Sequence, residues 1–176
     1  MMSQQQVVYI SLGANVGEPG GQLWQAVRKL ATHDRVALRG TSSLWRTSPV
    51  GPVADQPDFV NAVARLVTSL SPQALLTLCQ AIEDSMARDR DKEVPMGPRP
   101  IDLDILTFGE MVLEEEGLVI PHPEMAVRAF VLEPLRELDP EFVHPATGKA
   151  VEEMLKALPK GQKAEKIGPL GGLVGP

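Results

Sequence analysis

The stretch "GPRPIDLDIL", Gly97 to Leu106, decides the fold because it has the pattern of a core strand that carries two carboxylates. Side chains alternate across a strand, so the apolar residues Ile101, Leu103 and Ile105 share one face. Asp102 and Asp104 share the opposite face, roughly 7 Å apart at the backbone. This pattern predicts a sheet with one buried apolar face, while the face that carries the two acids opens on a binding site.

The aspartate pair is typical of a magnesium site. Two carboxylates this close repel each other unless cations lie between them. Mg²⁺ prefers oxygen ligands, and it usually takes one or two carboxylates together with water and substrate phosphates. The alternative interpretation is a half-exposed strand with solvated acids, and an isolated Asp-x-Asp favours it. The metal hypothesis therefore depends on the residues around the pair.

Composition limits the class of protein. With 176 residues, 43% of them hydrophobic, the chain can bury one sizeable core. The net charge of −6 argues against a partner held through its phosphate backbone, so no nucleic acid is expected. We find no apolar stretch of membrane-spanning length and no leader pattern, which predicts a cytoplasmic protein without membrane contact. The one cysteine, Cys79, excludes an internal disulfide and is expected in the core.

Periodicity and capping signals predict the secondary structure. Strands are expected at Val7–Gly13, Val36–Trp45, Phe59–Val67 and along the aspartate stretch, with a short hairpin at Glu110–Ile120. Helices are expected near Gln22–Thr32, from Pro72 to about Arg88, near Glu133–Leu138 and at Val151–Leu158. Ser71 is the expected N-cap residue of the second helix, and Pro72 its first helical residue.

The order β-α-β-β-α-β predicts an α+β fold, a ferredoxin-like sandwich in which an antiparallel sheet carries its helices mainly on one face. Phe59 and Asn61 would then share the open face with the aspartates. Residues 1–158 are expected to form this single domain. Residues 159–176 lack periodicity and are rich in Gly and Pro, which indicates a surface-bound or mobile tail.

Three further groups of residues are candidates for binding. The turn-rich loop Thr47–Asp58 leads into Phe59 and Asn61, which together suit a flat heterocycle: the ring stacks and the amide pairs with its edge. Arg88 and Arg99 bracket a charged loop beside the aspartates, and guanidinium groups neutralise phosphates. The segment IPHPEMAVRAF adds a histidine and an arginine. Taken singly, the loop could be an ordinary connection, the two arginines could be solvated charges, and the histidine could be a turn residue.

Five stretches in order along the chain carry a resemblance. They are VVYISLGAN, SSLWRTSPVGP, QPDFVNAV, GPRPIDLDIL and IPHPEMAVRAFVLEPL. From about Val7 to Leu138 the chain closely resembles the 6-hydroxymethyl-7,8-dihydropterin pyrophosphokinase family of folate biosynthesis. The resemblance implies a monomeric, cytoplasmic, ferredoxin-like enzyme. It would bind ATP, 6-hydroxymethyl-7,8-dihydropterin and two Mg²⁺ ions, transfer pyrophosphate to the hydroxymethyl group and release AMP.

The resemblance also implies roles for single residues. Asp102 and Asp104 match the metal-binding pair, and Asp104 is further expected to assist catalysis with the two arginines, Arg88 and Arg99. The pterin pocket is matched by Thr47, Ser48, Val50, Phe59, Asn61 and Phe130. Positions that contact ATP are matched by Gln80, Glu83, Ile105, His122 and Arg128.

The chain departs from the family at Met96 and Gly117, and two alternative functions are also compatible with the sequence. Met96 stands where the family commonly has a tryptophan, and Gly117 stands where some members place an ATP-contacting arginine. One alternative function is another Mg²⁺-dependent nucleotidyl or glycosyl transfer that uses the Asp-x-Asp pair. The other is a non-catalytic ferredoxin-like binding module.

Overall fold

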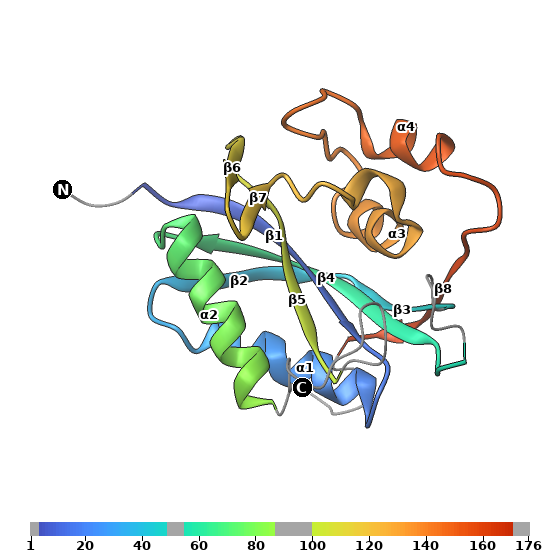
Figure 1. Ribbon diagram of the computed structural model, residues 1–176, viewed down its shortest axis with the longest axis horizontal. Coiled ribbons are helices and arrows are strands. Elements are labelled where there is room, and N and C mark those ends of the chain that lie inside the picture. Colours follow the sequence, from blue (N-terminus) through green and yellow to red (C-terminus); the bar gives the residue numbers. More distant parts are fainter. Residues whose placement is uncertain (1–3, 49–54, 87–99, 171–176) are drawn as a thin grey trace.

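A computed structural model describes residues 4–48, 55–86 and 100–170 of the chain. Its main sheet is antiparallel, and Figure 1 shows it at the centre of the molecule. The strands follow one another in the order β5 (Asp102–Phe108), β1 (Gln6–Ala14), β4 (Phe59–Thr68), β3 (Ser43–Thr47) and β8 (Ala164–Pro169), and β2 (Val36–Thr41) also pairs with β4. With β2 and β3 as one strand, the first four positions have the ferredoxin-like order, which confirms the predicted α+β fold.

Helices α1 (Pro19–Ala31) and α2 (Pro72–Ser85) pack on one face of this sheet. Ser71 caps α2 as predicted, because its hydroxyl accepts a hydrogen bond from the Ala74 N–H at 3.1 Å. Alternate residues of β1, β4 and β5 meet the apolar sides of both helices in one core, and Cys79 is wholly buried there. This layer is the predicted helical face.

A second, smaller layer covers part of the opposite face. It consists of the 3₁₀ turn η1 (Met125–Val127), helix α3 (Ala129–Leu138) and helix α4 (Val151–Lys156), and it lies above β4 and β3 in Figure 1. Its core includes Tyr9, Val63 and Leu106 from the sheet. Asp102 and Asp104 lie nearer the start of β5 than Leu106 and are half-buried. The second layer therefore covers one end of this face and not the end that carries the aspartates.

One strand and one helix differ most from their predicted limits. The strand expected at 36–45 is broken at Ser42, whose N–H donates to the Val63 carbonyl at 2.8 Å while its hydroxyl accepts from the Val63 N–H at 2.9 Å. The serine hydroxyl thus replaces a backbone carbonyl in the ladder, and β2 and β3 continue along β4 as separate strands. Helix α3 begins at Ala129, earlier than predicted, which places Phe130 in its first turn.

The predicted hairpin is confirmed as β6 (Leu113–Glu115) and β7 (Leu118–Ile120), with Gly117 at φ +81° in the turn. Strand β8 was not predicted. It pairs with β3 from Ser43 opposite Pro169 to Thr47 opposite Ala164. Its sequence, AEKIGP, has no clear alternation, so backbone pairing at the sheet edge determines it rather than a buried face. None of the helices within the described ranges is long and apolar enough to cross a membrane.

Candidate active site

The two aspartates lie at the start of β5, on the face turned away from α1 and α2. Leu103 and Ile105, which alternate with them, are 4% and 5% exposed and belong to the core beneath those helices. In the antiparallel register Asp102 is opposite Gly13 of β1 and Asp104 is opposite Ser11. The predicted separation of acids and apolar residues on this strand is confirmed.

The start of β5 is held by two side chains from the helices. Glu83 of α2 is 3% exposed, and its Oε2 atom accepts a hydrogen bond from the Leu103 N–H at 2.8 Å. Gln22 of α1 donates from its Nε2 atom to the Pro100 carbonyl. Both contacts fix the backbone on either side of Asp102, so the helices position the first carboxylate without touching the open face.

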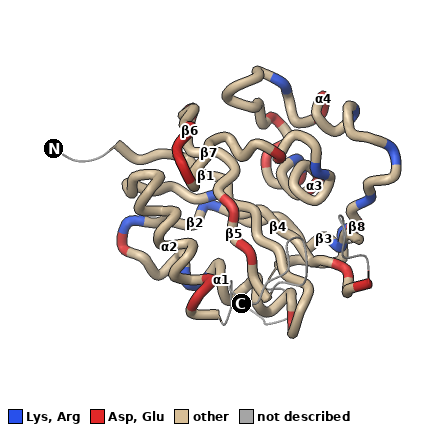
Figure 2. Tube along the Cα trace, in the orientation of Figure 1, with Lys and Arg blue, Asp and Glu red and all other residues tan. Residues whose placement is uncertain are grey.

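Negative charge accumulates beside β5. Burial, followed by the charges of Glu83 and Asp104, raises the pKa of the Cys79 thiol to about 12. The thiol is therefore neutral and inert, in agreement with its predicted role in the core. Acidic positions also recur along β5 and the β6–β7 hairpin in Figure 2.

His122 and Arg128 lie on the segment after β7, which contacts β5 at Leu106. The chain returns to this strand after β7, where the His122 N–H donates to the Leu106 carbonyl at 2.8 Å. Its Nδ1 atom accepts from the Glu124 N–H at 3.1 Å, which leaves the proton of the neutral ring on Nε2. Burial and then the charge of Arg128 lower the pKa of His122, outweighing the opposite effects of Glu124 and Asp102. A neutral imidazole that can donate from Nε2 therefore lies within the electrostatic range of Asp102.

On the other side of β1 lies a polar pair suited to a heterocycle. The Asn61 Nδ2 atom donates to the Thr47 hydroxyl at 2.8 Å, and both residues are buried. Asn61 is opposite Gly13 in the β1–β4 register, as Asp102 is in the β1–β5 register. A Cβ atom on Gly13 would lie 2.9 Å from the Asn61 Oδ1 atom. Gly13 therefore leaves open the space between the amide and the carboxylates.

Two phenylalanines lie on β4 and on α3, which packs against β4 and β3. Phe59 begins β4 opposite Thr47, and Phe130 lies in the first turn of α3. Each is half-buried, and the Arg128 guanidinium lies 5.4 Å from the centre of the Phe130 ring. Buried Asn15 donates to the Pro57 carbonyl at 3.0 Å, which ties the end of β1 to the chain entering β4. The rings thus come from two elements that the fold holds independently.

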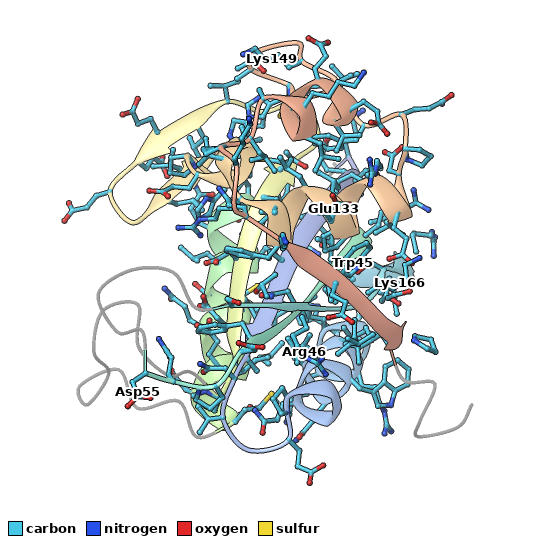
Figure 3. The ribbon with its side chains drawn as sticks, turned by 90° about the vertical axis from the view of Figure 1, so that its right-hand side faces the viewer. Trp45, Arg46, Asp55, Glu133, Lys149 and Lys166 are labelled. Carbon is cyan, nitrogen blue, oxygen red and sulfur yellow. The ribbon has the colours of Figure 1, made fainter. Side chains whose placement is uncertain are left out.

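Glu137 of α3 fixes β3, the strand that ends in Thr47. Its carboxylate accepts hydrogen bonds from the Ser43 N–H at 2.8 Å and from the Trp45 ring nitrogen at 3.0 Å. Lys166 of β8 pairs with the same carboxylate at 3.1 Å and lies 5.7 Å from the centre of the Trp45 ring, beside it in Figure 3. One carboxylate thereby joins α3, β3 and β8.

The remaining predicted site residues are less well placed or not described. Val50, Arg88, Arg99 and Met96 lie outside the described residues. Ser48 and Gln80 are exposed, at the end of β3 and on α2. The Ile105 side chain points into the core, which leaves only its backbone for a nucleotide contact. The sequence prediction missed Gly13, although a glycine inside a strand is a known signal of close approach by another group.

The acids that the structure describes fit a hard cation but do not enclose one. Carboxylate oxygens are the ligands that Mg²⁺ prefers. Across residues 4–48, 55–86 and 100–170, no group of three or more His, Cys, Asp or Glu side chains is arranged to hold a metal ion. A magnesium site at Asp102 and Asp104 would therefore be completed by phosphate oxygens and water, as is usual for this ion.

Comparison with known proteins identifies the family. The sequence model described as 7,8-dihydro-6-hydroxymethylpterin-pyrophosphokinase (HPPK) matches residues 9–140. The chain is 45% identical over 154 residues to the 2-amino-4-hydroxy-6-hydroxymethyldihydropteridine pyrophosphokinase of Pseudomonas aeruginosa, covering 88% of this chain and 93% of that protein. The chain belongs to the HPPK family.

Other relatives agree with this assignment. The Bacillus subtilis protein of the same name is 42% identical over 147 residues, covering 84% of this chain and 86% of that one. Among solved structures, the wild-type HPPK-DHPS of Plasmodium falciparum with pteroate superposes with a TM-score of 0.69 at 14% identity. That superposition covers 89% of this chain and 43% of the larger one, and at this identity it shows the HPPK fold alone.

Proposed function

We propose that this HPPK-family chain transfers pyrophosphate from ATP to the hydroxymethyl group of 6-hydroxymethyl-7,8-dihydropterin, releasing AMP and the pterin diphosphate used in folate biosynthesis. The observation that carries the proposal is the position of Gly13 between Asp102 and Asn61 in the sheet. A carboxylate pair for phosphates and an amide for a heterocycle thereby face one space, as transfer between the two substrates requires.

Asp102 and Asp104 would hold two Mg²⁺ ions. When bound, these ions would mask phosphate charge and lower the pKa of a coordinated hydroxyl group. Asp104 would also assist deprotonation of the attacking alcohol. His122, donating from Nε2, and Arg128 would orient the phosphates by hydrogen bonds that favour negative charge.

The pterin ring would lie between Phe59 and Phe130. Asn61 offers both a donor and an acceptor to the ring edge, and its hydrogen bond to Thr47 fixes which atom faces which way. Ser48 and Val50 would complete the pocket from the loop after β3. Stacking and edge pairing together select a planar heterocycle with alternating donors and acceptors.

The remaining roles concern ATP and the reaction itself. The nucleotide would be contacted by Gln80, Glu83 and the backbone of Ile105. Glu83 would act mainly through the hydrogen bond that it accepts from the Leu103 N–H. A primary alcohol is a weak nucleophile, and the triphosphate repels it. Arg88 and Arg99 would neutralise the developing charge, so catalysis would rest on positioning and electrostatics rather than on covalent chemistry by the protein.

We further propose that the chain acts as a cytoplasmic monomer. The pyrophosphokinase domain expected at residues 1–158 would also include β8, since that strand pairs with β3 in the main sheet. The net charge of −6 supports a protein that does not bind nucleic acid.

Product analysis tests the proposed function. Purified protein would be given ATP, Mg²⁺ and 6-hydroxymethyl-7,8-dihydropterin, and the nucleotides would be separated by chromatography. We expect AMP to form in equal amount to the pterin diphosphate and only when the pterin is present. Formation of ADP or of free pyrophosphate would instead indicate a different kinase or a nucleotidyl transferase, and the absence of any turnover would favour a binding module.

A further inference from the structure

The first turn of α3 lacks a cap from its own N-cap residue. Arg128 occupies that position, and its side chain makes no capping hydrogen bond. Its guanidinium instead pairs with Glu124 at 3.1 Å and lies over the Phe130 ring. The first N–H groups of a helix have no partner within the helix, so a cap has to come from elsewhere.

Gln162, from the segment after α4, supplies this cap. Its Oε1 atom accepts from the Ala129 N–H at 2.9 Å, and its Nε2 atom donates to the Val127 carbonyl at 2.8 Å. These two backbone groups lie on either side of Arg128. The Gln162 side chain therefore fixes the peptide groups on both sides of Arg128, which is proposed to bind ATP. It also fixes the turn that carries Phe130.

The same segment is attached to the other half of the proposed pterin pocket. Two residues after Gln162, Ala164 begins β8 opposite Thr47 of β3. In Figure 1 the chain leaves α4, runs along the outside of the molecule and enters β8. We call residues 157–169 the C-terminal strap, since they connect the start of α3 with the end of β3.

Between the end of α4 and the start of β8, the strap borders an open groove. Residues 158–165 line a groove of about 850 Å³ together with Ser48 of the β3 end and Ala129 of α3. The body of α3 is packed against the sheet and joined to β3 by Glu137, whereas the first turn of α3 borders the groove at Ala129. The hydrogen bonds of Gln162 join the strap to this first turn, and through the strap they relate Phe130 to Thr47.

We propose that Gln162 is a positioning residue for the substrate site, through which the C-terminal strap holds Arg128 and Phe130 in place relative to Thr47. This inference rests on the proposed function. It concerns a part of the chain beyond residue 140, where the match to the family model ends. The strap would thus be a working part of the site and not a passive tail.

The position of α3 itself does not depend on Gln162. Val131, Leu132 and Leu135 bury this helix against the sheet and α4. Loss of Gln162 should therefore leave the fold in place and release only the first turn. This separates a positioning role from a structural one.

Gln162→Met and Gln162→Glu test the proposal. Methionine keeps the length of the side chain and removes both hydrogen bonds, whereas glutamate keeps the acceptor for the Ala129 N–H and loses the donor to Val127. Gln73→Met is the matched control, because Gln73 of α2 also makes one side-chain hydrogen bond, to Glu115 at 2.8 Å. KM for both substrates, kcat, melting temperature and amide exchange of Ala129 in the ligand-free protein would be measured.

We expect Gln162→Met to raise KM for the pterin and for ATP by about tenfold, the effect of losing two ordinary hydrogen bonds. Exchange of the Ala129 amide should accelerate, while kcat and the melting temperature change little. Gln162→Glu should lie between this variant and the wild type, and Gln73→Met should match the wild type in every measurement.

Wild-type activity together with unchanged KM values in Gln162→Met would overturn the role of the strap and leave the proposed function intact. A lower melting temperature with unchanged KM would also overturn it, since Gln162 would then serve stability alone. Failure of the wild type to form AMP would overturn the proposed function, and unchanged Ala129 exchange would separately show that the cap does not form.

Discussion

The Oδ1 atom of Asn61 lies beside the backbone of Gly13, where the Cβ atom of any other residue would approach it to 2.9 Å. Gly13 is also opposite Asp102 on the next strand. The missing side chain therefore has a consequence for both proposed substrates: it leaves the amide in its hydrogen bond to Thr47 and leaves the space in front of the carboxylates open.

Gly13→Ala should displace Asn61 and weaken pterin binding. The added methyl group meets a buried amide that cannot move without giving up its bond to Thr47, so we expect the Kd for the pterin to rise by about tenfold, the effect of losing one to two ordinary hydrogen bonds. Titration calorimetry in the presence of a non-hydrolysable ATP analogue would measure it. Gly21→Ala is the control, since a Cβ atom at that position meets nothing within 4 Å. Equal pterin affinity in Gly13→Ala and the wild type would contradict this account.

Thr47→Val should affect both stability and binding. It keeps the shape of the side chain but removes the acceptor for the Asn61 Nδ2 atom, and a buried donor without a partner costs about 1–3 kcal/mol. Chemical denaturation would measure the loss in free energy of unfolding, and calorimetry the loss in pterin affinity. Thr47→Ser keeps the hydroxyl and should preserve affinity. If valine bound the pterin as well as threonine does, the hydrogen bond between Thr47 and Asn61 would not orient the amide.

Glu137 should make stability depend on pH in the acidic range. Partial burial raises the pKa of its carboxyl, but the hydrogen bonds that it accepts, led by those from Ser43 and Trp45, lower it below the ordinary value of 4.5. The unfolded chain therefore binds this proton more readily than the folded one. The contribution of Glu137 to stability is fully present above about pH 4.5 and is lost as the pH falls through the folded-state pKa.

Melting temperatures at several pH values would show this effect. Glu137→Gln should melt below the wild type at pH 7, and the difference should shrink as the pH falls below 4.5. Glu141→Gln, an exposed change in the loop after α3, should show no such trend. A constant difference between wild type and Glu137→Gln across the range would mean that the charge of Glu137 does not stabilise the fold.

Local patterns were sufficient to predict much of the fold. The alternation in β5, the Ser71 cap of α2 and the hairpin around Gly117 depend on neighbouring residues, and the sequence contains those neighbours. The break at Ser42 could not be predicted in this way, because it depends on a hydrogen bond to Val63 of another strand. Strand β8 is likewise determined by the free edge of β3.

The candidate site was predictable to a similar extent. The face shared by Asp102 and Asp104 follows from alternation, and the resemblance supplied their proposed partners. The contacts that place those partners come from long-range packing: Glu83 on the Leu103 N–H, and Gln162 on both sides of Arg128. No local pattern marks these two residues, since each acts through the backbone of a distant segment.

AMP formation by Asp102→Asn is the most direct test of the central claim, that the paired carboxylates of β5 organise the reaction. Asparagine keeps the size of the side chain and removes its charge, so the fold should persist and the melting temperature should stay close to that of the wild type. With Mg²⁺, ATP and the pterin at saturation, we predict that the rate of AMP formation falls by about 10²-fold or more, the scale of losing one positioned electrostatic group. Asp34→Asn, at an exposed turn, should keep the wild-type rate. A near-normal rate in Asp102→Asn would contradict the assignment of this face of β5 as the active site.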